Sequence, residues 1–211
     1  MRALLVGATG LVGREMLKLL VDEPACTRII VLARRPLPSP PPKVEAHVVD
    51  FDHLEAAASL VDADAVFCAL GTTMRQAGSQ ERFRRVDYGY ALAVARLARE
   101  RGARQFLLVS ALGADARSRI FYNRVKGELE EAVLALGYPG VTIVRPSLLL
   151  GEREEFRLGE RIFAHLGWLV PRRFKPVRAA SVAAALVRSA VEGAPGVRIV
   201  ESRDIQGHAG G

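Results

Sequence analysis

Three evenly spaced glycines at the start of the chain place the strongest constraint on its fold. An apolar run over residues 3–6 leads directly to Gly7, and glycines recur at Gly10 and Gly13, where an amphipathic helical pattern begins. This order of strand, turn and helix is typical of a nucleotide site. Gly7 permits a tight turn, Gly10 lets backbone N–H groups approach a pyrophosphate, and Gly13 lets helix and strand pack closely. The spacing is looser than the standard dinucleotide fingerprint, so the other parts of such a site must come from further along the chain.

Apolar runs alternate with helical patterns along most of the chain. After the first strand, buried strands are expected at residues 29–33, 46–50, 65–70, 105–110 and 141–145. Helices are expected from about residue 54, over 80–101, over 119–136 and near 181–191, with a late strand at 197–200. Six strands in alternation with helices predict the α/β class and a doubly wound parallel sheet, a Rossmann fold with its site at the carboxyl ends of the strands.

The length of 211 residues fits a single domain that spans 1–211. Within it, we expect residues 151–180 to form a short segment that covers the substrate, and residues 205–211 to form a flexible tail. The polar residues 74–80 are expected to form a flexible loop at the site, with Arg75 and Gln76 as candidates for substrate contact.

The composition limits the classes of partner. The net charge is +7, but the basic residues are scattered along the chain, so we attribute them to solvated helix faces and expect no nucleic-acid partner. No apolar run approaches the roughly 18 residues of a membrane helix, and the N-terminal run ends in the glycine turn, so we expect a cytoplasmic protein with no membrane partner. Two cysteines, Cys26 and Cys68, give neither a disulfide framework nor a zinc cluster, and no metal site is expected.

Arg34 and Arg35 directly follow the second predicted strand. In a Rossmann unit this position meets the adenosine ribose, where an acid binds a free 2′-hydroxyl and an arginine pairs with a 2′-phosphate. No acidic residue stands here, so the sequence favours NADP(H) over NAD(H) as the cofactor. The alternative is that two arginines simply end a strand in solvent.

Tyr122 and Lys126 are four residues apart in a predicted helix, and therefore share one face. A phenol with a pKa of about 10 is a poor acid–base catalyst at neutral pH, and a nearby ammonium favours its phenolate form. Ser110 ends the fifth predicted strand, where its hydroxyl could orient a substrate carbonyl while Tyr122 donates a proton. The alternative is a surface Tyr/Lys pair and a serine that merely ends a strand.

These motifs together resemble the short-chain dehydrogenases/reductases of the atypical or extended kind, and in particular the HIV-Tat-interacting oxidoreductase-like branch. The similarity extends to about residue 190, and rests on the glycine turn and on residues 48–52, 67–73, 86–87, 110–115, 122–128 and 145–146. It implies a Rossmann fold, bound NADP(H) and catalytic roles for Ser110, Tyr122 and Lys126. By analogy with the family, backbone near Pro146 would approach the nicotinamide, and Asp50 and Phe51 would approach the adenine.

The residues expected to bind the cofactor are Gly7, Thr9, Gly10, Leu11, Val12, Gly13, Arg34, Arg35, Asp50, Phe51, Leu70, Gly71, Thr72, Lys126 and Pro146. One departure from the family concerns its fourth catalytic residue, an asparagine, which has no obvious counterpart here. Asp87 stands in a comparable helix. The segment after Gly151 is also short for a sugar-nucleotide pocket.

Three functions remain in competition at this stage. The leading one is an NADPH-dependent reductase of a small carbonyl or quinone-like molecule. The second is a non-catalytic NADP(H)-binding redox sensor that acts through a protein partner, and the last is a nucleic-acid-binding protein that uses the positive charge. Monomer and homodimer both stay open.

Overall fold

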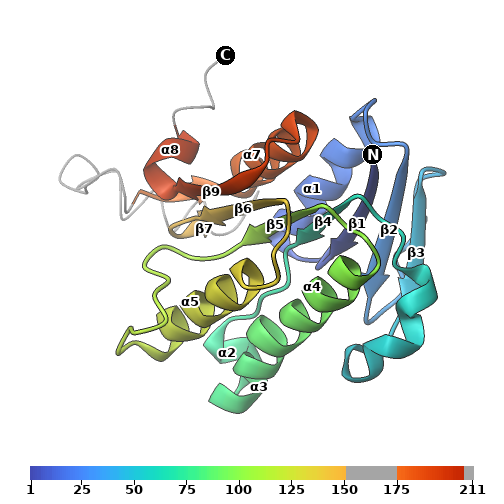
Figure 1. The fold of residues 1–211 in the computed structure, drawn as a ribbon. Helices are drawn as coiled ribbons and strands as arrows, with labels where there is room; N and C mark the ends of the chain where they lie inside the picture. Colours follow the sequence, from blue (N-terminus) through green and yellow to red (C-terminus); the bar gives the residue numbers. More distant parts are fainter. Residues whose placement is uncertain (151–174, 207–211) are drawn as a thin grey trace.

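The computed structural model describes residues 1–150 and 175–206, and its centre is a parallel sheet of seven strands (Figure 1). The strand order is β3-β2-β1-β4-β5-β6-β9, and every neighbouring pair is parallel. The strands are β1 (Arg2–Val6), β2 (Arg28–Ala33), β3 (Val44–Val48), β4 (Ala65–Cys68), β5 (Gln105–Val109), β6 (Gly140–Arg145) and β9 (Gly196–Glu201). The prediction of a doubly wound Rossmann sheet is confirmed.

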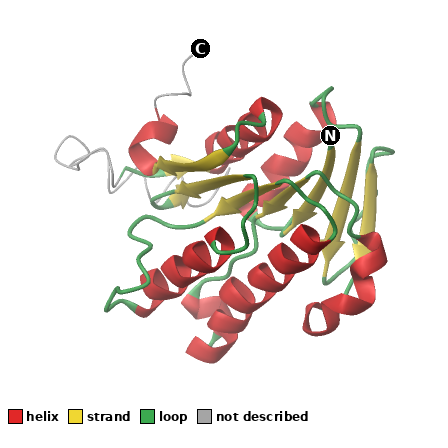
Figure 2. Ribbon diagram, in the orientation of Figure 1, coloured by secondary structure: helices red, strands yellow, loops and turns green. Residues whose placement is uncertain are grey.

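Helices cover both faces of this sheet (Figure 2). One face carries the 3₁₀ helix η1 (Phe51–Leu60), α4 (Ala91–Glu100) and α5 (Phe121–Leu134); the other carries α1 (Leu11–Asp22) and α7 (Ala179–Glu192). Alternate strand side chains enter the two layers: Leu4 and Val6 of β1 lie in the first, Ala3 and Leu5 in the second. No helix in the described ranges is long and apolar enough to cross a membrane.

The structure corrects several predicted boundaries. The third strand starts two residues earlier than expected, and the late strand joins the sheet as a seventh strand beside β6. Residues 74–80, expected to be a flexible loop, contain the short helix α2 (Met74–Ala77) and the start of α3 (Gln80–Arg84). Thr73 caps α2 in a reciprocal capping box with Gln76, which accounts for the order of this segment.

The expected single helix over 80–101 is interrupted. Between α3 and α4 the backbone forms a π-helical turn, η2 (Arg85–Tyr90), with a wider hydrogen-bonding pattern than an α-helix. The helix ends where predicted: Gly102 follows the C-cap with a φ of 93°.

The C-terminal region also differs from its prediction. The flexible tail was expected to begin at residue 205. Residues 205 and 206 instead belong to α8 (Ser202–Gln206), in which Ile205 is buried. Most of the expected substrate-covering segment, 151–180, lies outside the described residues; its last part forms β8 (Val177–Arg178), which pairs with β7 (Leu149–Leu150).

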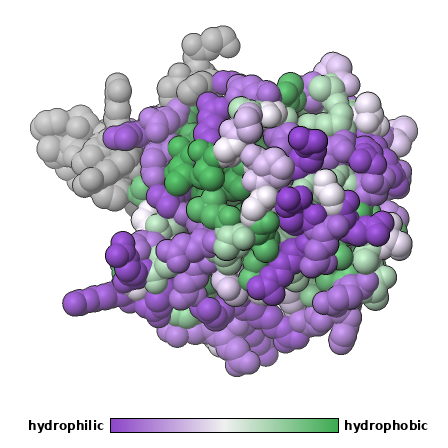
Figure 3. Space-filling view, viewed as in Figure 1, coloured by the Kyte–Doolittle hydropathy of each residue, from purple (hydrophilic) through white to green (hydrophobic). Residues whose placement is uncertain are grey.

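Strand β9 is an edge of the sheet. Its Val197 and Ile199 pair in register with Val141 and Ile143, which α5 buries, but they themselves are 60% and 44% exposed. Figure 3 shows apolar surface gathered in this region. Helix α5 therefore covers β6 but does not extend over β9.

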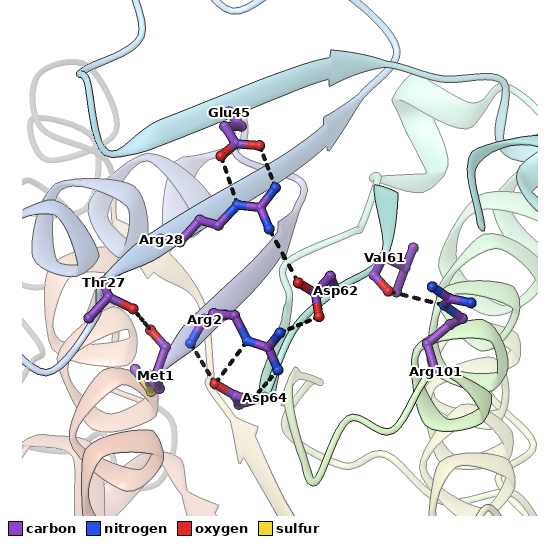
Figure 4. A network of polar contacts seen from close by, with 9 residues as sticks. All are labelled: Met1, Arg2, Thr27, Arg28, Glu45, Val61, Asp62, Asp64 and Arg101. Carbon is purple, nitrogen blue, oxygen red and sulfur yellow. Dashed lines mark hydrogen bonds and ion pairs between the residues drawn. The ribbon is translucent and has the colours of Figure 1, made fainter. Parts of the chain in front are cut away.

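A network of ion pairs ties together the amino ends of the first strands (Figure 4). Arg28 donates from Nε and Nη2 to the two carboxylate oxygens of Glu45, both at 2.7 Å, and its Nη1 lies 3.3 Å from Asp62. Arg2 pairs with Asp62 and with Asp64, which also accepts the Arg2 backbone N–H at 2.8 Å. This network lies at the amino ends of the strands. The candidate site lies at the other end, where the strands have their carboxyl ends.

Candidate functional site

The glycine turn between β1 and α1 is built by close backbone contacts. Gly7 has a φ of 84°, and a Cβ atom at this position would lie 2.4 Å from the carbonyl oxygen of Ala69. A Cβ at Gly13 would lie 2.0 Å from the carbonyl oxygen of Gly7. Neither position can hold a side chain, so the tight turn and the close helix–strand contact expected from the sequence are both present.

The first turn of α1 suits an anionic group. Its N-cap, Gly10, has no side chain to accept from the helix, and the first turn contains no acidic residue. The N–H groups of Leu11, Val12 and Gly13 therefore lack an acceptor within the helix, as at any helix start. Gly10 and the neighbouring Thr9 are exposed. The N–H groups and the positive end of the helix dipole fit a pyrophosphate.

The end of β2 provides exposed positive charge. Arg34 and Arg35 follow Ala33, both are exposed, and within the described part of the chain neither forms an ion pair. In the nearby turn after β3, Phe51 is 5% exposed, and its ring packs on Tyr90 at a centroid distance of 5.4 Å. Only backbone at Phe51 is left for the predicted adenine contact. Asp50 is exposed and pairs with His53 at 2.8 Å.

Lys126 forms an ion pair with Asp87 inside the protein. Its Nζ lies 2.7 Å from Asp87 Oδ1, and the two side chains are 4% and 0% exposed. The other carboxylate oxygen of Asp87 accepts the backbone N–H of Thr72 at 2.9 Å. The π-helical turn η2, helix α5 and the loop after β4 therefore meet at these two side chains.

The charge of Lys126 is shaped by this environment. Burial alone would lower the pKa of Lys126, but the charge of Asp87, and after it Tyr122, raises this pKa above its ordinary value. The ammonium form is therefore kept at neutral pH. Nearby, burial raises the pKa of the Cys68 thiol to about 11, so this cysteine is not a reactive thiolate.

Tyr122 lies one turn before Lys126, in the first turn of α5, and its ring is partly buried. It packs against the fully buried Phe83 of α3, with ring centroids 5.4 Å apart. Helix α3, not expected as a separate element, thus supports the residue predicted to be the proton donor.

Ser110 lies at the end of β5, as predicted, but its hydroxyl is directed inward. The backbone N–H donates to Val144 at 2.8 Å, and Oγ donates to Glu130, which is 4% exposed. Arg145 holds the same carboxylate through Nε, 3.1 and 3.2 Å from its two oxygens, and pairs with Glu201 at 3.1 Å. The Ser110 hydroxyl thus donates to Glu130 rather than to Tyr122 or Lys126.

Sequence reasoning missed Glu130, and it noted Asp87 without giving it a partner. A signal for Glu130 was available, because residues 122, 126 and 130 follow one face of α5 at intervals of four. Pro146, expected near the nicotinamide, is buried after β6, and its carbonyl accepts from Leu112 N at 2.8 Å. The loops after β5 and β6 are joined there. No group of three His, Cys, Asp or Glu side chains in the described ranges could hold a metal ion.

Comparison with protein families decides the class of the chain. A family model described as NAD(P)H-binding matches residues 7–192. The chain belongs to this NAD(P)H-binding family. The match begins at Gly7, the first residue of the glycine turn, and includes Asp87, Tyr122 and Lys126.

Two relatives of this NAD(P)H-binding chain carry the same name. It is 38% identical to "Protein FMP52, mitochondrial" of Eremothecium gossypii, over 97% of this chain and 96% of that protein. It is 35% identical to the protein of the same name from Candida albicans, over 93% of this chain and 90% of the relative. These names give a compartment but no reaction.

The expectation of a cytoplasmic protein is corrected by these relatives, which are named mitochondrial proteins. The composition could not separate the two compartments, because an α/β domain has the same apolar sheet and polar helix faces in either one.

Solved structures share the fold of the NAD(P)H-binding chain. MoeE5 in complex with UDP-glucose and NAD matches with a TM-score of 0.73 at 16% identity, covering 97% of this chain and 79% of that one. UDP-glucose 4-epimerase from Thermotoga maritima, with UDP-glucose, matches with a TM-score of 0.70 at 14% identity, covering 95% and 77%. The chain thus shares its Rossmann-like α/β fold with these two proteins.

Proposed function

We propose that this NAD(P)H-binding protein is an oxidoreductase that reduces a small carbonyl or quinone-like substrate with NADP(H). The observation that carries the proposal is the position of Tyr122 one helical turn from Lys126, whose buried ammonium lies beside the Gly71–Thr72 loop. Within the short-chain dehydrogenases/reductases, we propose a relation to the HIV-Tat-interacting oxidoreductase-like branch, which the motifs at residues 67–73, 110–115 and 122–128 support.

The residues present fit three parts of the cofactor: the pyrophosphate, the 2′-phosphate and the nicotinamide ribose. The N–H groups at the start of α1 would bind the pyrophosphate, and Arg34 and Arg35 would pair with a 2′-phosphate, which is the basis for preferring NADP(H). Lys126 would hydrogen-bond the nicotinamide ribose. When bound, the reduced dinucleotide supplies the hydride.

Tyr122 would act as the general acid and donate its phenolic proton to the substrate oxygen. The Lys126 ammonium would stabilise the phenolate that remains. Ser110 was expected to orient the carbonyl, but its single hydroxyl proton is donated to Glu130. It contributes to substrate orientation only if this hydroxyl turns from Glu130 towards the substrate.

The test is a fluorescence titration with NADPH and NADH, followed by a turnover screen with aldehydes, ketones and quinones. We expect NADPH to bind more tightly, and Arg34→Ala to weaken NADPH binding about tenfold while leaving NADH binding unchanged. Tyr122→Phe should abolish turnover but keep cofactor affinity, whereas the matched control Tyr88→Phe should retain both.

Two outcomes would change the proposal. Unchanged turnover in Tyr122→Phe would remove Tyr122 as the acid. Tight NADPH binding by the wild-type protein with no turnover on any substrate would favour the redox sensor instead.

A further inference from the structure

Asp87 is the most deeply buried charged side chain of the described residues, with 0% exposure. One carboxylate oxygen lies 2.7 Å from Lys126 Nζ, and the other accepts the Thr72 N–H at 2.9 Å. Gly71 lies directly beside the pair: a Cβ there would be in ordinary van der Waals contact, 3.5 Å from Asp87 Oδ1 and 3.7 Å from Lys126 Nζ. The carboxylate thus joins the Lys126 side chain to the loop after β4.

The backbone at Asp87 is itself unusual. Asp87 lies within η2, the π-helical turn that interrupts an otherwise α-helical segment. Single π-turns within α-helices are rare and occur frequently at functional sites. Here the turn contacts α5, the helix that carries Tyr122 and Lys126.

Stability alone is a poor explanation for this pair. Taking two charges out of water is unfavourable, and well-packed apolar residues of similar volume are often as stable as a buried ion pair. A buried ion pair that also binds a loop backbone therefore points to a role in the site.

We propose that Asp87 is a positioning residue, which fixes the Lys126 ammonium against the backbone of Thr72 at the place where Lys126 would meet the nicotinamide ribose. This inference rests on the proposed function for the role of Lys126. It supplies a partner for the catalytic lysine in a chain that lacks the family's asparagine.

The charge of Lys126 follows from the groups that face it. These are Asp87 on η2, Tyr122 on α5 and Cys68 at the end of β4. Burial lowers the pKa of Lys126, and Asp87 is the main group that raises it. In Asp87→Asn the effect of burial would dominate, so Lys126 would lose its proton at a lower pH than in the wild-type protein.

The first test is the pH dependence of NADPH binding by the full chain, measured by nicotinamide fluorescence with wild type and Asp87→Asn. We expect binding to weaken as pH rises, with the midpoint about one pH unit or more lower in Asp87→Asn. Asp64→Asn is the matched control, because it neutralises another ion-paired aspartate at the opposite edge of the sheet, and it should keep the wild-type midpoint. Superimposed curves for wild type and Asp87→Asn would overturn the proposal.

The binding curve separates this inference from the proposed function, because it needs no turnover. If the wild-type protein binds NADPH but reduces nothing, the oxidoreductase proposal fails, and the shift in Asp87→Asn still decides the role of Asp87. Where turnover is found, the alkaline limit of kcat should shift in the same direction.

Asp87→Glu gives a second test, which can be carried out even if Asp87→Asn does not fold. Glutamate keeps the negative charge but is one methylene longer, so it should keep the wild-type pH midpoint while moving the ammonium away from Thr72. We expect NADPH affinity to fall about tenfold at every pH. Wild-type affinity in Asp87→Glu would overturn the positioning role.

Discussion

Ser110 donates its hydroxyl proton to Glu130, a carboxylate that Arg145 holds from the other side. This contact ties the end of β5 to helix α5, and the ion pair ties α5 to β6. The serine expected to face a substrate is thus part of the internal support of the helix that carries Tyr122 and Lys126.

Replacing Glu130 with alanine is expected to lower the free energy of unfolding by about 3 kcal/mol, because Arg145 loses its buried partner and Ser110 its acceptor. Ser110→Ala removes a single hydrogen bond and should cost about 1 kcal/mol. Urea denaturation of both variants measures the difference. A larger loss in Ser110→Ala than in Glu130→Ala would contradict this hierarchy.

Lys43 closes the C-terminal end of α1. Its Nζ donates to the backbone carbonyls of Leu20, Val21 and Glu23 at 3.2, 3.0 and 2.7 Å. A cation at this end also complements the helix dipole, so Lys43→Met should lower the free energy of unfolding by about 1–2 kcal/mol. Lys18→Met replaces an exposed lysine within α1 itself. It should lower the free energy of unfolding by less than about 0.5 kcal/mol, measured for both variants by urea denaturation. Equal losses in the two variants would contradict a capping role for Lys43.

Gly13→Ala is expected to be severe, because its new Cβ would lie 2.0 Å from the carbonyl oxygen of Gly7. We expect a loss of about 3 kcal/mol in the free energy of unfolding and weaker NADPH binding, since the first turn of α1 must move away from β1. Gly89→Ala is the control: its nearest neighbour would be at 3.9 Å, so thermal unfolding should stay close to wild type. A Gly13→Ala protein with wild-type stability would show that the turn is less tightly packed than described.

The pair between Asp50 and His53 predicts a pH effect at the surface. The hydrogen bond and charge of Asp50 raise the pKa of His53 above its ordinary value, and the contact with His53 lowers the pKa of Asp50. The stabilisation linked to His53 is therefore fully present below its unfolded pKa of about 6.5, and is lost as pH rises through the folded value. An NMR titration of the His53 ring should give a lower pKa in Asp50→Asn than in wild type. An unchanged titration would show that the pair does not form in solution.

The parts of this fold that depend on local pattern were predictable. The glycine turn follows from Gly7 and Gly13, and the strands from apolar runs bounded by turn residues. The order of α2 was also accessible, because Thr73 and Gln76 have the spacing of a capping box, but the polarity of residues 74–80 favoured a loop instead.

Contacts between segments that are distant in the chain could not be predicted from local sequence patterns. The partner of Lys126, Asp87, lies 39 residues earlier in the chain. It stands on a π-helical turn, which the spacing of apolar residues in the sequence does not predict. The partner of Ser110 lies 20 residues later, on the inner side of α5. The residue types were visible in the sequence, but their pairing depends on how η2, α5 and the strand ends meet in space.

The contact between Gly7 and Ala69 has a consequence for how this protein could evolve. A Cβ at Gly7 would lie 2.4 Å from the carbonyl oxygen of Ala69, so the two backbones are in direct contact. The neighbouring strands β1 and β4 therefore hold the glycine turn and the loop that leads to Thr72 and Asp87 at a fixed spacing. The distance between the two halves of the proposed dinucleotide site is thus set by the strand spacing of the sheet. Substitutions that change the substrate preference can accumulate in the surrounding loops without altering that distance.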